Sequence, residues 1–359
     1  MKGLSLFANV GIGETYLEQL GIEIVVANEL LEDRAEFYRK LHPNTKMICG
    51  SITDPKIYSE IIKEADGVDF IMATPPCQGM SQANAIKNSN DPRNSLIKMV
   101  VKAINDLRPK YVLIENVPGM ARSFIEHNGK SVNIMEFVKN NIPPSYTVNH
   151  EVLNASDYGT PQHRKRLITL ISSEAKWEMP KKHEKIHTVS EAIGHLPSLE
   201  SEDKSDIPWH FGRKHNARHI LWMKHTPTGE TAYDNPVHYP QIIDKNTGQI
   251  RMIRGFRSTY KRIKWHEPSP TIGMTNGSIN SQNNVHPGNK LKDGTYSDAR
   301  VLSVREITIL CGLPEDHFDK YENEIDENFM RHVIGECFPP KLCLEICKKI
   351  PSLSLTNKQ

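Results

Sequence analysis

Short apolar runs alternate with longer helical patterns over roughly the first half of the chain. The apolar runs are of strand length and nearly continuous, which is typical of strands buried on both faces of a sheet. They are Leu4–Ala8, Ile22–Asn28, Phe70–Ala73, Tyr111–Glu115 and Arg166–Ile171. The helical patterns are Gly13–Leu20, Arg34–Lys40, Lys56–Ala65, Ser95–Leu107 and Val132–Asn140. This alternation predicts an α/β fold with a mostly parallel, doubly wound sheet.

The pattern changes after Lys176. Proline, histidine and charged residues become frequent, and no long helical period is visible between about 205 and 298. Two final helical patterns follow at Val304–Cys311 and Lys341–Ile350. We therefore expect a Rossmann-like domain made of residues 1–176 and 300–359, and a smaller, irregular, partly β domain made of residues 177–299.

The net charge of +2 conceals a basic segment in the second domain. Residues 208–265 contain 11 Lys or Arg against 3 Asp or Glu, together with three of the four tryptophans, Trp209, Trp222 and Trp265. A basic segment interleaved with aromatic residues is typical of a nucleic-acid-binding surface. A solvated basic face without a partner would give the same charge, so the composition leaves both interpretations open.

The composition also indicates where in the cell the protein is expected. No apolar run approaches the ~20 residues that span a membrane, and the first residues lead into a strand rather than a signal peptide. The six cysteines form no C-x-x-C pair, so we expect reduced thiols and no structural metal. These features predict a cytoplasmic protein.

A cysteine follows the third predicted strand on a stiff turn, Thr74-Pro75-Pro76-Cys77. Two prolines fix the backbone there, and the carboxyl ends of parallel strands are where open α/β sheets bind ligands. Cys77 is therefore a candidate nucleophile. The alternative is a buried structural cysteine, which is common.

A glycine-containing turn follows the first predicted strand and is succeeded by an acid at the end of the second. Gly11 and Gly13 allow a close approach of backbone to ligand, and Glu29 stands where Rossmann-like folds bind ribose hydroxyls. This spacing favours a cofactor that contains adenosine. The full dinucleotide and P-loop glycine patterns are absent from the sequence, which disfavours NAD and ATP.

Two further candidates lie at later strands. Glu115 ends the fourth strand, where burial could keep the acid protonated, although a solvated loop acid is the alternative. Arg164 and Arg166 are two residues apart in an extended segment and so point to the same side. Together they could bind anionic or carbonyl oxygens, unless they form only a basic strand edge.

Taken in order, these segments resemble the conserved blocks of the DNA cytosine-5 methyltransferases. The main blocks are Pro75-Pro76-Cys77-Gln78, Glu115-Asn116-Val117 and Gln162-x-Arg164-x-Arg166. Supporting blocks are Phe7-Ala8-x-x-Gly11, Glu29, Asp91-x-Arg93-x-x-Leu96, Leu302-Ser303-x-Arg305-Glu306 and Gly335-Glu336. The sequence departs from the family pattern at Asn9, Ile12, Leu30, Ser51 and Glu336.

The resemblance implies an S-adenosylmethionine-dependent methyltransferase domain joined to a target-recognition domain. It implies methyl transfer to carbon 5 of a cytosine flipped out of a specific double-stranded DNA sequence, through a covalent bond between Cys77 and carbon 6. Glu115 would neutralise N3, Arg166 would bind the carbonyl oxygen, and Arg164 would support the site or a phosphate. The loop from Met80 to Asn94 would close over the base.

The resemblance also assigns binding residues. The cofactor would contact Phe7, Val10, Gly11, Glu29, Leu30, Ser51, Ile52, Pro76, Leu96 and Glu336. DNA would contact Gln78, Ser81, Arg93, Arg213, Arg218, Arg251, Arg254, Arg257, Lys261 and Arg262, with Lys214 and Lys224 as further candidates. We expect a monomer of a restriction-modification system, whose cognate endonuclease acts on the same site without a stable complex. An RNA methyltransferase of the tRNA-methylating branch and a catalytically silent DNA-binding module are the alternatives.

Overall fold

The chain forms two compact units in the computed structural model, which describes residues 1–76 and 95–356. Unit 1 comprises Met1–Asn154, Lys165–Lys182 and Pro340–Gln359, and unit 2 comprises Ala155–Arg164 and His183–Pro339. The boundaries differ from the expected ones, since residues 155–164 and 300–339 belong to unit 2. Their buried polar side chains, described below, bond to other segments of unit 2.

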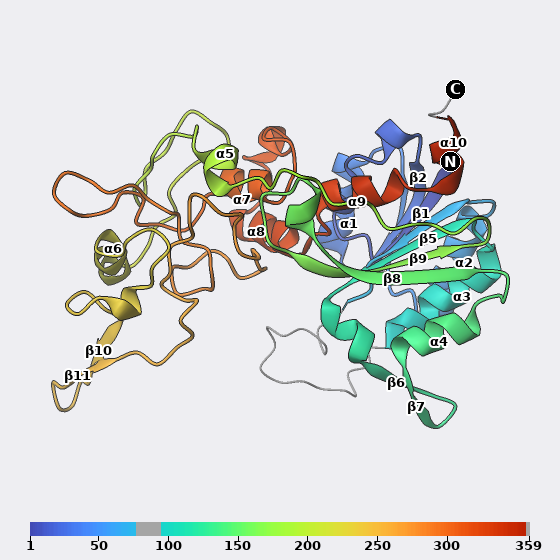
Figure 1. The fold of residues 1–359 in the computed structure, drawn as a ribbon, viewed down its shortest axis with the longest axis horizontal. Helices are drawn as coiled ribbons and strands as arrows, with labels where there is room; N and C mark the ends of the chain where they lie inside the picture. The colour runs from blue at the N-terminus through green and yellow to red at the C-terminus, as the bar shows by residue number, and fades with distance from the viewer. Residues whose placement is uncertain (77–94, 357–359) are drawn as a thin grey trace. The chain divides into compact units, whose positions relative to one another are not determined.

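A seven-stranded sheet forms the centre of unit 1, with the order β3-β2-β1-β4-β5-β9-β8 (Figure 1). The strands from β3 to β5 are mutually parallel, whereas β9 is antiparallel to β5 and β8 is antiparallel to β9. The mostly parallel α/β sheet expected from the sequence is therefore confirmed. The strands are β1 Lys2–Leu6, β2 Glu23–Glu29, β3 Lys46–Cys49, β4 Phe70–Ala73, β5 Tyr111–Asn116, β8 Thr147–Asn154 and β9 Lys165–Ser172.

Different helices cover the two faces of this sheet, because successive side chains of a strand point to opposite faces. Val26 and Ile48 belong to the apolar core shared with α2, α3 and α4. Their neighbours Ala27 and Met47 pack with Tyr38 of α1 instead. The helices of unit 1 are α1 Glu32–Leu41, α2 Pro55–Glu64, α3 Ile97–Leu107, α4 Ile134–Asn141, α9 Pro340–Cys347 and α10 Pro351–Thr356.

Local signals explain where helices begin, and also where the prediction failed. The side chain of Asp54 caps α2 by accepting from the N–H of Lys56 at 2.7 Å, and Pro55 suits the first helical position. The helix predicted over 13–20 is instead two short 3-10 turns, η1 Ile12–Glu14 and η2 Glu18–Leu20. The second turn stops at Gly21, which adopts the left-handed conformation. The helix expected from 132 starts later, because β7 Lys130–Asn133 pairs with β6 Phe124–His127.

Unit 2 contains few regular elements, as expected from its irregular sequence. One apolar cluster of unit 2 includes Trp222, Met223, Tyr260 and Val285. No helix among residues 1–76 and 95–356 is long and apolar enough to cross a membrane. The elements of unit 2 are α5 Val189–Ile193, α6 Ala217–Lys224, β10 Gln241–Ile243, β11 Ile250–Met252, α7 Val304–Leu310, α8 Glu327–Glu336 and the 3-10 turns η5 Ala155–Tyr158, η6 Ala232–Asp234 and η7 Asp319–Tyr321.

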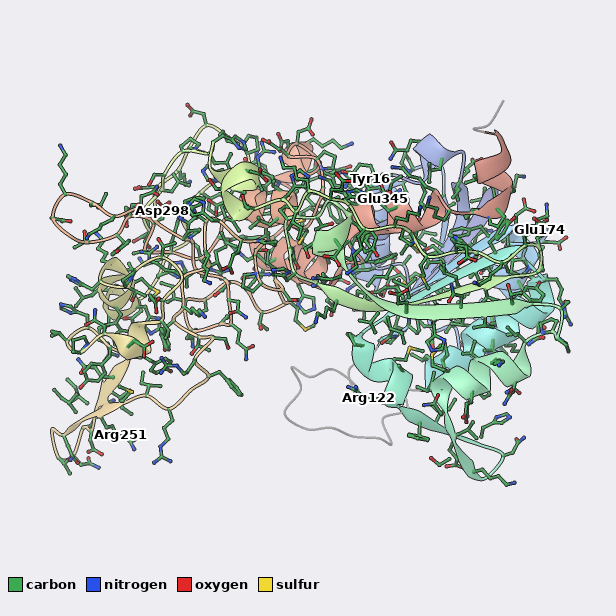
Figure 2. The ribbon with its side chains drawn as sticks, viewed as in Figure 1. Tyr16, Arg122, Glu174, Arg251, Asp298 and Glu345 are labelled. Atoms are coloured by element: carbon green, nitrogen blue, oxygen red, sulfur yellow. The ribbon has the colours of Figure 1, made fainter. Side chains whose placement is uncertain are left out.

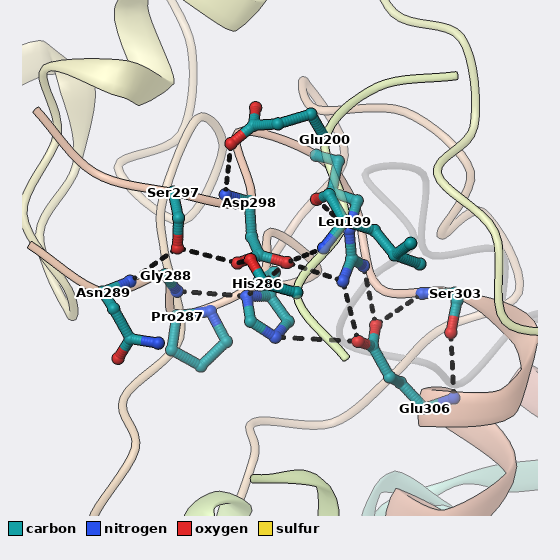
Figure 3. A network of polar contacts seen from close by, with 12 residues as sticks. Leu199, Glu200, His286, Pro287, Gly288, Asn289, Ser297, Asp298, Ser303 and Glu306 are labelled. Carbon is teal, nitrogen blue, oxygen red and sulfur yellow. Dashed lines mark hydrogen bonds and ion pairs between the residues drawn. The ribbon is translucent and has the colours of Figure 1, made fainter. Parts of the chain in front are cut away.

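A buried ionic network holds residues 298–306 within unit 2. Arg300 donates to both carboxylate oxygens of Glu306 at 2.8 and 2.9 Å and to Asp298 at 2.8 Å. Figure 3 shows the Asp298 and Glu306 carboxylates with His286 beside them. Burial opposes the charge on Glu306, but the neighbouring Arg300 outweighs it and holds the pKa of this carboxyl well below its ordinary value. Ser303 caps α7 and forms a reciprocal capping box with Glu306.

Candidate active site at the strand ends of unit 1

The carboxyl ends of β1 and β4 form the switch point of the sheet. These two strands are neighbours, but β2 and β3 lie on one side of β1 while β4 and β5 lie on the other. Ligands bind open α/β sheets at such a point. The two loops that leave it are joined, because the hydroxyl of Thr74 donates to the carbonyl of Phe7 at 2.9 Å.

The turn after β1 has an unusual backbone. Phe7, Asn9 and Gly11 all have positive φ, at 60°, 50° and 78°. Asparagine tolerates this conformation better than most residues, which accounts for Asn9 at a position where the family pattern has glycine. Gly11 has no substitute, since an added Cβ would lie 2.3 Å from Nε2 of His42. The turn can therefore bring its backbone close to a ligand.

Glu29 closes this turn from the end of β2. Its two carboxylate oxygens accept from the N–H groups of Asn9 at 2.9 Å and Leu31 at 3.1 Å. Leu30, directly after it, is 61% exposed. A carboxylate fixed by backbone donors can still accept from hydroxyl groups, and an exposed leucine offers apolar surface beside it. This pairing suits a nucleoside, as the sequence led us to expect.

The other expected cofactor residues divide into two groups. Val10 and Ile52 are buried, at 0% and 3% exposure, and their expected contacts with the cofactor stay predictions. Ser51 is half-buried, with its hydroxyl 2.8 Å from that of Thr53. Pro76 and Leu96 are likewise half-buried. Glu336 ends α8 in unit 2 and lies 3.5 Å from Nε2 of His332.

An ionisable pair that the sequence did not reveal lies beneath the turn. Glu14 is 4% exposed, and the hydroxyl of Tyr38 donates to it at 2.5 Å. Burial raises the pKa of Glu14 to about 7, although the nearby hydroxyl groups of Ser5 and Tyr38 lower it in part. The only sequence signal was an acid within the predicted helix over 13–20.

Glu115 and Arg166 form a close ion pair at the ends of β5 and β9. Nε of Arg166 lies 2.6 Å from a carboxylate oxygen of Glu115, and the two side chains are 12% and 10% exposed. The alternatives of a solvated loop acid and a bare basic strand edge are therefore wrong. The pair presents a carboxyl and a guanidinium together, so that hydrogen-bond acceptors and donors lie side by side.

Arg164 does not share the position of Arg166, although the two are close in sequence. It belongs to unit 2, is 2% exposed, and donates to the carbonyls of Ile272 at 2.9 Å and Gly335 at 3.0 Å. A guanidinium buried against backbone carbonyls supports the local structure. The expectation that Arg164 contacts a phosphate, or binds oxygens jointly with Arg166, is wrong for this conformation.

Asn116 is a site residue that the sequence reasoning did not single out. Its amide nitrogen donates to the carbonyl of Pro75 at 2.8 Å, and its amide oxygen accepts from the N–H of Val117 at 2.9 Å. Asn116 thus ties the end of β5, next to Glu115, to the proline turn. The signal was present, because Asn116 lies inside a segment that the resemblance already marked.

Some expected residues fall outside the described part of the chain. Residues 77–94 include Cys77, Gln78, Ser81 and Arg93, and also the expected closing loop from Met80 to Asn94. These assignments stay predictions.

The basic residues of unit 2 are placed in different ways. Arg262 is 0% exposed and donates to the carbonyls of Met223 and His286, so it cannot contact DNA in this conformation. Trp209 and Trp222 are each 3% exposed, so these aromatic residues of the basic segment belong to the core. The remaining candidates have exposed or partly exposed side chains: Arg213, Lys214, Arg218, Lys224, Arg251, Arg254, Arg257 and Lys261.

Comparisons with known proteins identify the family of the chain. A model of the C-5 cytosine-specific DNA methylase family matches residues 1–352. Type II methyltransferase M1.HgaI of Avibacterium volantium is 45% identical over 357 residues, covering 98% of both chains. Type II methyltransferase M1.HphI of Haemophilus parahaemolyticus is 27% identical, covering 99% of this chain and 87% of the other.

Solved structures show the same fold at low identity. A prophage-encoded protein of E. coli, described as a DNA modification methyltransferase, matches with a TM-score of 0.70 at 19% identity over 99% of both chains. The S. pombe Dnmt2 methyltransferase matches with a TM-score of 0.57 at 15% identity, again over 99% of both chains. With the fold, the strand-end site and the full-length family match in agreement, the chain belongs to the C-5 cytosine-specific DNA methylase family and is a DNA cytosine-5 methyltransferase.

Proposed function

We propose that this enzyme methylates carbon 5 of a cytosine flipped out of a specific double-stranded DNA sequence, through a covalent intermediate on Cys77. The observation that carries the proposal is the Glu115–Arg166 pair. It stands beside the proline turn that leads to Cys77, and Asn116 joins the two segments. An acid and a guanidinium beside the turn that Cys77 follows in the sequence suit covalent chemistry on a pyrimidine.

The roles of the residues follow from the chemistry of the ring. The thiolate of Cys77 adds to carbon 6, Glu115 neutralises the charge that develops at N3, and Arg166 binds the carbonyl oxygen. Carbon 5 then acts as the nucleophile and takes the methyl group. Loss of the carbon 5 proton lets the bond to Cys77 break and restores the aromatic ring. The target must leave the base stack for any of these contacts to form.

S-adenosylmethionine supplies the electrophilic methyl group when it is bound. Glu29 and Leu30 fit its nucleoside, because one offers a fixed carboxylate and the other an exposed apolar side chain. The left-handed turn from Phe7 to Gly11 would hold the rest of the cofactor. No ion pair of Glu29 with a described residue occupies its carboxylate, so it stays available to hydroxyl groups.

The exposed arginines of unit 2 support duplex DNA as the substrate, since most protein contacts to DNA engage phosphates. Because its full-length relatives are Type II methyltransferases, we propose that the enzyme protects DNA in a restriction-modification system. It would act as a monomer in the cytoplasm, beside an endonuclease that reads the same site without forming a stable complex with it.

Bisulfite sequencing of a plasmid that carries the gene tests the activity and identifies the target site. One recurrent methylated sequence is expected. Methyl transfer to purified tRNA but not to duplex DNA would reject the choice of substrate.

A duplex with 5-fluorocytosine at that position tests the covalent step. With the methyl donor present, the duplex should become trapped on residue 77. Cys77→Ser should abolish trapping and methylation but keep DNA binding, and retained turnover would rule out the nucleophile.

A further inference from the structure

Exposed apolar side chains are concentrated in one short segment of unit 2. Of the 12 large hydrophobic residues that are exposed in the described chain, five lie between residues 237 and 256. Single exposed hydrophobics are normal, but a cluster of them marks an interaction surface. They are Val237 at 66%, Ile243 at 57%, Ile250 at 53%, Met252 at 50% and Phe256 at 68%.

Three of these residues share one face of a two-stranded ribbon. In the antiparallel pair β10–β11, Gln241 is opposite Met252 and Ile243 is opposite Ile250. Opposed residues point to the same side, and every second residue of a strand does so too. Ile243, Ile250 and Met252 therefore form one exposed apolar face, which we call the ribbon face. Arg251, which is labelled in Figure 2, is opposite Ile242 in this register and therefore lies on the other side of the ribbon.

Hydrogen bonds and apolar packing hold the ribbon at both ends. The N–H of Ile253, directly after β11, donates to the carbonyl of Pro240 at 2.8 Å, and the side chain of Ile253 packs on the apolar cluster that includes Trp222 and Tyr260. At the tip, Asp244 accepts from the N–H groups of Asn246 and Thr247 at 2.9 and 3.0 Å. The apolar residues are thus presented on a hairpin with fixed ends (Figure 1).

The charge around the ribbon face matches an anionic partner. Arg251 and Arg254 are exposed and form no ion pair with any described residue. Residues 236–257 contain four Lys or Arg and one Asp, and that aspartate, Asp244, already caps its own turn. Arg257 is paired with Asp234. Exposed guanidinium groups on the ribbon and directly after it, together with an apolar ribbon face, suit a partner that offers both phosphates and apolar groups.

We propose that the β10–β11 ribbon enters the major groove of the substrate and places its ribbon face against the C5-methyl groups of thymines in the target sequence. The major groove admits a two-stranded ribbon, and the thymine methyl is the apolar group on its base edges. Arg251 and Arg254 would contact the flanking phosphates. This inference rests on the proposed function, because it names the element that reads the substrate.

The test compares two pairs of side chains on duplexes built around the methylated site. In Ile243→Thr/Ile250→Thr, the ribbon keeps β-branched residues but loses apolar surface. It should bind the specific duplex about tenfold more weakly and nonspecific duplex normally, with an unchanged salt dependence. Arg251→Ala/Arg254→Ala should weaken both duplexes alike and flatten the salt dependence. Leu291→Thr, which likewise replaces an exposed aliphatic residue of unit 2 by threonine, at a 45% exposed site, should bind like the wild type.

Replacing thymine by deoxyuridine removes only the methyl groups. On this replacement, the affinity of the wild type for the specific duplex should fall about tenfold. The Ile243→Thr/Ile250→Thr variant, which already binds the thymine duplex weakly, should bind the deoxyuridine duplex with nearly the same affinity. Equal wild-type binding to the two duplexes, a target site without A·T pairs, or full discrimination by the variant would overturn the proposal. Bisulfite sequencing of the wild type separates these outcomes from failure of the proposed function. Methylation of the plasmid shows that the enzyme is active on DNA, whichever element of unit 2 reads the target site.

Discussion

The amide of Asn116 donates a hydrogen bond to the carbonyl oxygen of Pro75 at 2.8 Å. This bond fixes the proline turn against the end of β5, and Asn116→Asp removes the donor with little change of shape. A carboxylate facing a buried carbonyl destabilises this position of the proline turn by about 1–3 kcal/mol. Because the turn leads to Cys77, we expect the rate of methyl transfer to fall by roughly one to two orders of magnitude. Trapping rates on a 5-fluorocytosine duplex measure the effect.

Asn105→Asp is the matched control for this change. Asn105 donates from its amide to the carbonyls of Val101 at 2.9 Å and Asn141 at 2.7 Å, between α3 and the end of α4. It should lower the thermal stability without a selective loss of trapping. Equal trapping rates in the two variants at equal stability would show that the Asn116 bond has no special role.

Gly11→Ala should disable the cofactor turn. The new Cβ would lie 2.3 Å from Nε2 of His42, at a φ of 78° that disfavours every residue with a Cβ. Strain alone costs about 1–2 kcal/mol, and the clash adds to it. We expect at least a tenfold loss of affinity for S-adenosylmethionine by titration calorimetry.

Gly21→Ala separates strain from the clash, since Gly21 has a φ of 71° but an added Cβ meets nothing within 4 Å. This control should lose stability but bind the cofactor normally. Normal cofactor affinity in Gly11→Ala would mean that the turn is not where the cofactor binds.

The sequence predicted the fold of unit 1 well because its strands are buried on both faces and therefore read as continuous apolar runs. The two edge strands of the sheet, β3 and β8, were missed, and for β8 the reason is the opposite one. It lies at the sheet edge with mostly exposed or half-buried residues, so its sequence carries no such run. The positions of Glu29 and Glu115 at strand ends could also be predicted, because local sequence is enough to locate the end of an apolar strand.

What the sequence could not supply were contacts between distant segments. Arg262 and Arg251 look alike in a basic stretch, yet one is buried among backbone carbonyls and the other is exposed. The same holds for Arg164, whose partners Ile272 and Gly335 lie more than 100 residues away in the chain. Charge counts cannot separate arginines that stabilise a core from arginines that meet a ligand.

Arg300→Met should destabilise unit 2 strongly. It leaves the buried carboxylates of Asp298 and Glu306 without their cation, which costs about 3–5 kcal/mol in comparable buried pairs. Arg257→Met removes an exposed pair with Asp234 and should cost less than about 1 kcal/mol. Urea unfolding followed by fluorescence of the buried tryptophans of unit 2, Trp209 and Trp222, measures both. Similar losses in the two variants would contradict the assigned role of the network.

Glu14 should make the stability of unit 1 depend on pH. Burial raises its pKa from 4.5 to about 7 in the folded chain, so the folded state holds a proton that the unfolded state releases earlier. The free energy of unfolding should therefore fall as the pH rises from about 4.5 to about 7, by on the order of 3 kcal/mol, and change little from this cause above that. Glu14→Gln stays neutral throughout and can still accept from Tyr38, so it should remove this decline.

The informative quantity is the difference between the melting temperatures of variant and wild type, measured near pH 5 and again near pH 8. Histidines with lowered pKa values, such as His215 and His286, titrate equally in both proteins and cancel in that difference. The melting temperature of Glu14→Gln should rise relative to that of the wild type as the pH rises. Glu18 is an exposed acid one turn later, and Glu18→Gln should show no such relative rise. A difference that is the same at both pH values would show that Glu14 is ionised in the folded protein, and that the turn above it is held over a charged carboxylate.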